Sequence, residues 1–381
     1  MKDKSKVIAP RKYIQMELAL AEASKKCIVS CDRVAIHGTK LIVEKIIRRI
    51  VSAMKTQSSI FASMYVKNFN GGSIYEKTKI GKPDEFDIDI LLKIPEIMGA
   101  VLKEGYAPGF AQIQLTNFGK LPDIDEQWQT VFGEFVDPEN YVLSSEMMAF
   151  FVWKIFEKAL LNVFPDSVIK IQGNCYKITK IEYIEPAVTL TIEGSNFYVD
   201  VDLVTSLVLD GRFWPGGSCR QNPYITPNEF FLTPTRPKGD YDHRGRFWRL
   251  SFHMQERQIV FNRYKMKPAF RVLKWIRDYF DHTVRSYAIK TIFLWELCKD
   301  NPVLDQDTPD LWKAPLSYIV VHMLEKYLEC LAQANISDFW NKDLNLLCYL
   351  SEAEMEVYKR DTAEVLDHVK NNPKNLLRYL E

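Results

Sequence analysis

Two short segments of the sequence alternate acidic with apolar residues, and this alternation restricts the fold more than any other feature. In EFDIDI, the acids Glu85, Asp87 and Asp89 alternate with apolar side chains. Because successive side chains of a β-strand point to opposite faces, these acids are predicted to share one face of a strand. The segment FYVDVDLV places Asp200 and Asp202 on one face in the same way. The chain therefore contains two predicted strands, each with an acidic and an apolar face.

Carboxylates held close together repel one another unless cations neutralise them. One interpretation is an exposed strand face whose acids pair with lysines. The other is a site for hard divalent cations, which bind carboxylates together with substrate phosphates. Two acidic strands side by side would offer three carboxylates to a pair of metal ions, an arrangement suited to in-line phosphoryl displacement. Gly72 and Ser73 precede the first strand, and their backbone N–H groups and hydroxyl are small enough to approach a triphosphate.

The pattern along the whole chain predicts a mixed α/β lobe over residues 1–245, then a helical lobe over 246–381, with an N-terminal helix long enough to pack across both. A polar connection, Thr233–Arg246, lies near this boundary. Hydrophobic periodicity and β-branched residues place the elements. The predicted helices are Leu41–Met54, Pro268–Phe280, Val284–Asp300, Leu316–Ala334 and Glu352–Val369, and the predicted strands are Glu85–Leu92, Cys175–Glu182, Ala187–Glu193 and Phe197–Val204.

Cysteine usage and the absence of sorting signals predict a cytoplasmic protein. The seven cysteines are scattered and odd in number, unlike a disulfide framework. The first fifteen residues are basic but lack the apolar stretch of a secretory signal. No run of about 18 apolar residues is present, so no membrane span is expected.

A net charge of +1 conceals two basic regions. Residues 1–55 contain thirteen Lys and Arg against five Asp and Glu, and residues 236–274 contain eleven against three. Localised basic regions on a nearly neutral protein indicate a localised anionic partner. Solvated basic surfaces without a ligand are an equally simple interpretation of the charge alone.

Three segments resemble a known family. GSIYEKTKIGKPDEFDIDI, from Gly72 to Ile90, resembles the active-site stretch of the cyclic GMP–AMP synthase (cGAS)-like receptors, which are nucleotidyltransferases. FWRLSFHMQER, Phe247–Arg257, resembles their substrate-binding segment, and RSYAIKTIFLWELCKDNP, Arg285–Pro302, resembles their helix with a base-stacking tyrosine. The likeness runs in order from Leu41 to Cys348. It implies a bilobed α+β fold of the polymerase-β-like type, with a long N-terminal spine helix.

The resemblance implies metal-binding and catalytic roles for three acids. Glu85 and Asp87 would hold Mg²⁺ or Mn²⁺, and Asp202 would be the third ligand and help to activate the attacking ribose hydroxyl. Asp200 lies two residues away on the same face and stays the alternative third ligand. The pattern assigns no role to Asp89.

The resemblance also implies nucleotide-binding roles on both sides of a cleft. Gly72 and Ser73 would hold the triphosphate, and Lys274 and Ser286 would contact phosphates. Three further residues would act at the nucleotide: Tyr287 by stacking on a base, Arg249 by bonding a base edge, and Glu256 by contacting the ions or the donor nucleotide indirectly. Without the resemblance, these residues also fit purely structural roles. Tyr287 would be a core aromatic, and Lys274 and the nearby Lys290 would be solvated charges on helices.

One departure from the family bears on the activator. The DNA-sensing members carry a zinc-binding insertion after the segment matched here by Gln255–Asn262. This chain has no cysteine between Cys219 and Cys298, so no zinc site is expected there. Cys27 and Cys31 are interpreted as buried thiols.

Members that lack the insertion are associated with double-stranded RNA, which proteins recognise by shape and phosphate contacts. We therefore expect RNA to bind a groove opposite the active-site cleft, formed by residues 236–274 and by the N-terminal basic set Lys40, Lys45, Arg48, Arg49 and Lys55.

Together these features predict an innate immune enzyme that joins ATP and GTP into a cyclic dinucleotide when RNA is bound. The alternatives are a catalytically silent binding protein of the same family and an enzyme that makes linear oligonucleotides. The phosphodiester linkage, the order of nucleotide use and an RNA-induced dimer are left open by the sequence.

Overall fold

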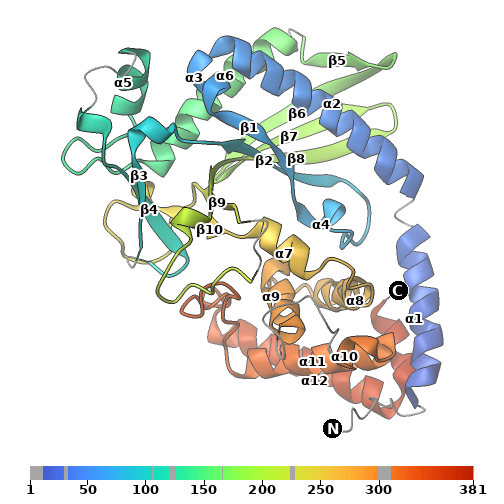
Figure 1. Ribbon diagram of the computed structural model, residues 1–381. Coiled ribbons are helices and arrows are strands. Elements are labelled where there is room, and N and C mark those ends of the chain that lie inside the picture. The colour runs from blue at the N-terminus through green and yellow to red at the C-terminus, as the bar shows by residue number, and fades with distance from the viewer. Residues whose placement is uncertain are drawn as a thin grey trace.

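The computed structural model describes residues 12–29, 33–104, 107–120, 126–164, 166–223, 228–298 and 310–380. A large sheet with helices packed on one side forms the N-terminal part, and helices alone form the C-terminal part (Figure 1). This arrangement confirms the predicted α+β class and the change from a mixed lobe to a helical lobe.

The helices agree with the predicted periodicity. Leu41–Met54 lies inside one long helix, and the four predicted C-terminal helices are present with ends shifted by a few residues. The α-helices are α1 (Lys12–Val29), α2 (Arg33–Gln57), α3 (Ser59–Met64), α4 (Gly72–Tyr75), α5 (Glu126–Gly133), α6 (Ser145–Val163), α7 (His253–Ile259), α8 (Met266–Tyr279), α9 (Ser286–Leu297), α10 (Asp310–Lys313), α11 (Leu316–Ala332) and α12 (Glu352–Asn371).

Ten strands form the sheet, in the order β3-β4-β10-β9-β8-β7-β6-β5, with β2 beside β8 and β1 beside β2. The strands are β1 (Tyr65–Asn70), β2 (Glu85–Leu92), β3 (Ala100–Lys103), β4 (Phe110–Leu115), β5 (Val168–Ile171), β6 (Asn174–Ile184), β7 (Ala187–Gly194), β8 (Phe197–Leu209), β9 (Phe230–Thr233) and β10 (Trp248–Ser251). The lobe boundary after residue 245 stays a prediction, and β10, which follows it, pairs with β9 and β4 in the sheet.

The two acidic strands are neighbours. β2 and β8 pair in parallel, with Glu85 opposite Asp200 and Asp87 opposite Asp202. In a parallel pair, residues opposite one another direct their side chains to the same face. The register therefore gathers the acids of both strands on one face of the sheet.

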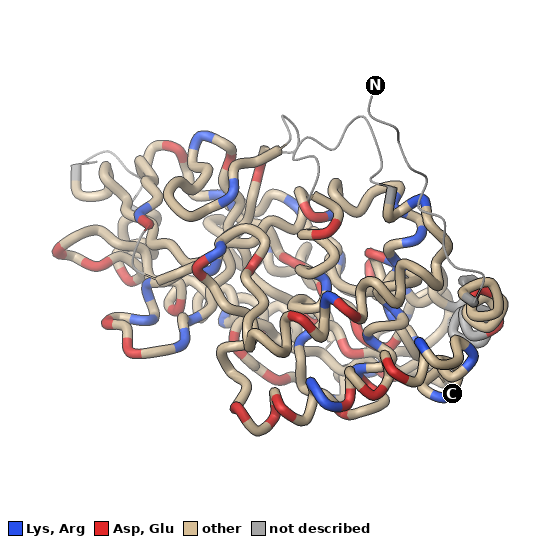
Figure 2. Tube along the Cα trace, turned by 90° about the horizontal axis from the view of Figure 1, so that it is seen from below, with Lys and Arg blue, Asp and Glu red and all other residues tan. Residues whose placement is uncertain are grey.

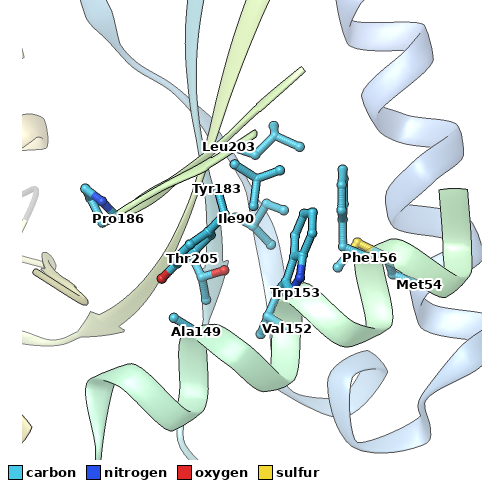
Figure 3. A pocket seen from close by; sticks show the side chains of 11 residues that line it. Met54, Ile90, Ala149, Val152, Trp153, Phe156, Tyr183, Pro186, Leu203 and Thr205 are labelled. Carbon is cyan, nitrogen blue, oxygen red and sulfur yellow. The ribbon is translucent and has the colours of Figure 1, made fainter. Parts of the chain in front are cut away.

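The opposite face of these strands belongs to the core. Ile90, Leu203 and Thr205 face Trp153 and Phe156 of α6 across a cavity of about 20 Å³ (Figure 3). A space of this size holds about one water molecule and no substrate. The chemistry of the sheet is thus confined to its acidic face.

The N-terminal helices reach both lobes (Figure 1). α2 packs on α6 above the sheet, and α1 packs on α11 and on the 3₁₀-helix Pro373–Tyr379 near the C-terminus. In α2 the apolar stripe that includes Ile46, Ile50 and Met54 is fully buried. The side chains of Cys27 and Cys31, for which buried positions are predicted, lie outside the described residues.

None of the helices in the described ranges is long and apolar enough to cross a membrane.

Candidate active site

Three predicted carboxylates meet at the acidic face of the sheet. Glu85, Asp87 and Asp202 each present an oxygen, and these oxygens all lie within 4.8 Å of one another. Glu85 is exposed, whereas Asp87 and Asp202 are half-buried. Such a set of hard oxygen ligands, close together and open on one side, fits a divalent cation such as Mg²⁺ or Mn²⁺.

The electrostatics of the acids support this fit. Burial, together with the charges of Glu85 and Asp202, raises the pKa of Asp87 to about 6. Burial also raises the pKa of Asp202, although a hydrogen bond that the Thr189 hydroxyl donates at 2.5 Å opposes the shift. Without a cation the carboxylates therefore destabilise one another, and a bound divalent ion would remove that repulsion.

A lysine partly neutralises the set. The Lys79 ammonium forms ion pairs with Glu85 at 2.9 Å and with Asp84 at 3.2 Å. Burial lowers the pKa of Lys79, but its hydrogen bond and charge interaction with Glu85 raise the value above its ordinary level. One cation therefore contacts the outermost of the three acids.

The other two acids on this face have protein partners. Asp200 accepts a hydrogen bond of 2.7 Å from the Thr191 hydroxyl. Asp89 is buried, accepts a hydrogen bond of 3.0 Å from the Ser206 hydroxyl, and lies 3.7 Å from Nδ1 of His253. Asp89 thus closes the inner end of the acidic row, where it holds β2, β8 and the start of α7 together.

The Gly-Ser turn lies directly against the acids. The Gly71 amide donates a hydrogen bond of 2.9 Å to the Asp87 carbonyl. Gly72 has φ +69°, and a Cβ at this position would lie 1.6 Å from Oδ2 of Asp87. Only glycine tolerates both the left-handed backbone and this close approach. The turn and the acids therefore form one site.

The helical lobe holds the segment that contains this turn. Three cationic side chains donate to carbonyls in or beside it: Arg257 to Asn70 at 2.5 Å, Arg271 to Lys77 at 2.8 Å and Lys274 to Thr78 at 3.4 Å. In addition, Lys290 forms an ion pair of 2.7 Å with Glu76. The turn is thereby positioned from both lobes.

A cleft of about 1170 Å³ lies between the sheet and the helices. A nucleotide-sized ligand needs a few hundred Å³, so the cleft has room for two. Asp202 lies beside Asp87 at its edge. Nine predicted site residues line it: Gly72, Ser73, Glu85, Asp87, Arg249, Glu256, Lys274, Ser286 and Tyr287.

The residues opposite the acids, on α8, α9 and the neighbouring strand β10, contact one another and their neighbours. The guanidinium of Arg249 lies 5.8 Å from the centroid of the Tyr287 ring. Arg277 donates a hydrogen bond of 2.8 Å to the Ser286 hydroxyl. Burial, aided by Arg277, lowers the pKa of Lys274 to about 8. The interpretation of Lys274 and Lys290 as solvated helix charges is wrong, since both are buried.

Glu256 is the most enclosed of the predicted site residues, with 1% of its surface exposed. Oε1 accepts hydrogen bonds of 3.0 Å from the Tyr287 hydroxyl and from Nε1 of Trp340, and Oε2 forms an ion pair of 2.9 Å with Lys290. Burial opposes ionisation of Glu256, but Lys290 lowers its pKa, so the group is a carboxylate. Its predicted nucleotide contact is therefore at most indirect.

The predicted nucleic-acid residues lie along α2, and none of the five lines the cleft. Arg48 and Arg49 are exposed, and the Lys55 ammonium lies 3.6 Å from the centroid of the Tyr65 ring. Basic and acidic positions are interspersed over the molecule as a whole (Figure 2). A polyanion would therefore depend on a local basic set rather than on overall charge.

The second basic region only partly matches its prediction. Arg236, Lys238, Arg249 and Lys274 line the active-site cleft, so the prediction that residues 236–274 lie opposite that cleft is wrong for these four. The cause is that β10, α8 and the segment between β9 and β10, which carry these residues, form the cleft's own wall.

Sequence reasoning missed several contributors to the site. Glu76, His253 and Asp338 were assigned no role, and Lys290 appeared only as a solvated charge. Glu76, His253 and Lys290 each lie within a segment that resembles the family, which was the one available signal for them. The partners of these residues are distant in the chain, so no spacing pattern identifies them.

Comparison with known proteins identifies the family of the chain. Residues 74–262 match the Mab-21 protein nucleotidyltransferase domain, and residues 265–364 match the Mab-21 protein HhH/H2TH-like domain. A cyclic GMP-AMP synthase-like receptor of Tribolium castaneum is 31% identical over 373 residues, which cover 96% of this chain and 92% of the relative. A receptor of the same name from Aethina tumida is 31% identical over 97% of this chain and 92% of the relative. The cyclic GMP-AMP synthase-like receptor 1 of Drosophila melanogaster is 24% identical over 79% of this chain and 82% of the relative.

Proposed function

The chain belongs to the Mab-21 family of nucleotidyltransferases, and we propose that it is an immune receptor enzyme that joins ATP and GTP into a cyclic dinucleotide when double-stranded RNA is bound. Its curated relatives carry the name cyclic GMP-AMP synthase-like receptor. The observation that carries the proposal is the close approach of the Gly72 turn to the Glu85, Asp87 and Asp202 carboxylates.

This arrangement suits phosphoryl transfer between nucleotides. Divalent ions, when bound, neutralise phosphate charge and favour deprotonation of an attacking hydroxyl. Glu85, Asp87 and Asp202 would hold them, because their oxygens converge and Lys79 pairs with Glu85 alone among the three. Asp202 is the preferred third ligand, since it lies opposite Asp87 in the β2–β8 register.

The rest of the cleft supplies nucleotide recognition. Gly72 and Ser73 present backbone N–H groups and a hydroxyl to the triphosphate, and Lys274 and Ser286 add a cation and a second hydroxyl from the helical wall. Tyr287 offers a ring for base stacking, with Arg249 beside it as a donor to a base edge. Positioning of both reactants in one cleft is a large part of such catalysis.

Double-stranded RNA is the proposed activator. Burial lowers the pKa of Lys40 on α2 and of Lys267 on α8, and the charge of Lys77 lowers both further. The segment that follows the Gly72–Ser73 turn contacts both basic regions, since the Lys40 ammonium lies 4.5 Å from the centroid of the Tyr75 ring and Arg271 donates a hydrogen bond of 2.8 Å to the Lys77 carbonyl. RNA bound there would contact the active-site segment itself and shift its population toward the triphosphate-binding form.

The deciding experiment is incubation with ATP, GTP and Mg²⁺ or Mn²⁺, with or without long double-stranded RNA or DNA, followed by identification of products by mass spectrometry. We expect a cyclic dinucleotide only with RNA. The absence of any nucleotide product would support the silent-relative alternative, and a linear product would support the oligonucleotide alternative. Activation by DNA alone would overturn the RNA assignment. The double variant Glu85→Ala/Asp87→Ala should make no product yet bind RNA normally.

The RNA surface has its own test. Arg48→Glu/Lys55→Glu should weaken RNA binding. It should also make the slope of log affinity against log salt concentration less steep, by about one unit for each lost phosphate contact. The control is Lys359→Glu/Lys374→Glu, which makes the same charge change on the helical lobe. Equal affinity and equal salt dependence in both variants would refute the placement on α2.

A further inference from the structure

A network of three charged side chains connects the Gly-Ser turn to the helical lobe. Glu76, Lys290 and Glu256 come from α4's C-terminal end, from α9 and from α7. Lys290 is 7% exposed and pairs with both carboxylates, at 2.7 Å to Glu76 and 2.9 Å to Glu256. Burial lowers the pKa of Lys290, but Glu256 and Glu76 raise it above its ordinary value, so the ammonium stays charged.

At one end this charge network holds Tyr287, the residue proposed to stack on a base. Tyr287 and Lys290 are three positions apart on α9, so they lie on the same face of the helix. Both contact Glu256, Tyr287 through its hydroxyl and Lys290 through its ammonium. The Tyr287 hydroxyl also lies 3.0 Å from Oδ2 of Asp338. The ring therefore has a fixed outer end and little freedom to change its rotamer.

At the other end the charge network holds the turn proposed to bind the triphosphate. Glu76 is the residue that ends α4, and its amide donates a hydrogen bond of 3.0 Å to the Gly72 carbonyl. A movement of the Glu76 side chain is thus transmitted to Gly72 and Ser73 within one turn of backbone. Lys290 joins this turn to Tyr287 through two ion pairs and one shared carboxylate.

We propose that Glu76, Lys290 and Glu256 act as positioning residues that couple base recognition at Tyr287 to triphosphate recognition at Gly72–Ser73. This inference rests on the proposed function, because it assumes that one nucleotide contacts both places. A ligand that spans two sites gains affinity when their spacing is fixed in advance. A nucleoside triphosphate therefore gains more from an intact link than a bare triphosphate does.

The test compares the affinities of ATP and inorganic tripolyphosphate, both with Mn²⁺, by calorimetry. The preference is defined as Kd(tripolyphosphate)/Kd(ATP), and GTP replaces ATP in a parallel series. The variant is Glu76→Gln, which keeps the side-chain shape and leaves Lys290 paired with Glu256. We expect the preference to fall by about 5-fold or more, the range of typical coupling between sites. A purely stabilising role would lower the melting temperature and leave the preference unchanged.

The matched control is Glu296→Gln. Oε2 of Glu296, also on α9, lies 2.9 Å from Nε2 of His322, and the Glu296 side chain is 11% exposed against 12% for Glu76. This variant should lose stability without change in preference. Glu76→Asp, which keeps the charge but shortens the link, should give an intermediate preference and is the fallback if Glu76→Gln does not fold.

The outcomes separate the two proposals. If the unmodified protein binds neither ATP nor tripolyphosphate, the proposed function fails. If it prefers ATP and the Glu76 variants keep that preference, only the coupling is refuted. An equal loss of preference in Glu296→Gln would also refute the coupling, since the effect would then follow from stability alone.

Discussion

The two walls of the cleft are built on opposite electrostatic principles. The sheet wall gathers Glu85, Asp87 and Asp202, of which only Glu85 pairs with a cation, Lys79, and the pKa of Asp87 is raised. On the opposite side, Lys290 of the helical wall pairs with Glu256 of that wall and with Glu76 of the turn segment, and the pKa of Glu256 is lowered. Two of the acids in the sheet wall thus have no cationic partner, whereas Glu76 and Glu256 already share Lys290.

The difference separates residues that bind from residues that position. A repulsive set of acids is retained although it destabilises the folded state, because a bound cation converts it into a favourable site. A compensated buried network needs no ligand, and removal of one member leaves another charge unpaired. Substitutions should therefore have opposite effects on stability in the two walls.

The largest expected effect lies in the sheet wall and concerns the third acid. Asp202→Asn should slow nucleotide transfer on the order of 1000-fold, since metal ions contribute several kcal/mol to such reactions. Asp200 bonds to Thr191 rather than to the triad, so Asp200→Asn should slow the reaction by no more than about 10–100-fold, as changes of outer-sphere groups do. Initial rates with RNA present measure both. The reverse order would make Asp200 the ligand.

In the helical wall, Lys290→Met should cost about 3–5 kcal/mol of unfolding free energy, because Glu76 and Glu256 would lose their cation. Denaturation in urea measures this loss. Lys326→Met, at a surface pair with Glu329, is the control and should cost less than about 1 kcal/mol. If the two variants were equally stable, the helical network would not differ from an ordinary surface pair.

Asp87→Asn should do the opposite and stabilise the metal-free protein. The pKa of Asp87 is raised from 3.8 to about 6, so the folded state binds this proton more tightly than the unfolded state does. Stability of the unmodified protein is therefore lost as pH rises from about 4 to 6, and the loss persists above pH 6. The gain in Asp87→Asn should reach about 1–3 kcal/mol at pH 7.5 and vanish near pH 4.

Melting temperatures in EDTA at both pH values measure this gain, and Mg²⁺ should stabilise only the unmodified protein. Destabilisation of Asp87→Asn at pH 7.5 in EDTA would contradict the account of the sheet wall as repulsive.

The two walls also differ in how far the sequence predicted them. The alternation of acids in β2 and β8 is local, so the acidic faces could be predicted, and the fold was confirmed. The register that places Asp202 beside Asp87 could not, because pairing of strands more than 100 residues apart leaves no local pattern. The helical network joins Glu76 to Lys290, 214 residues apart, and its burial depends on packing of three helices. The family resemblance identified Tyr287 and Glu256 as site residues, but it did not predict the contacts that hold them in place.

The smallest expected effect tests Lys274, a buried cation of the helical wall whose pKa is lowered. Burial lowers the pKa of Lys274 to about 8, so the unoccupied site loses this charge as pH rises through that value. A bound triphosphate holds the proton on Lys274, and binding above pH 8 therefore requires proton uptake. The Kd for ATP should weaken about tenfold between pH 7 and pH 9. Lys274→Met should bind more weakly at pH 7 and show a flat profile over this interval. A tenfold change that persists in Lys274→Met would assign the titration to another group and leave Lys274 without a role at the phosphates.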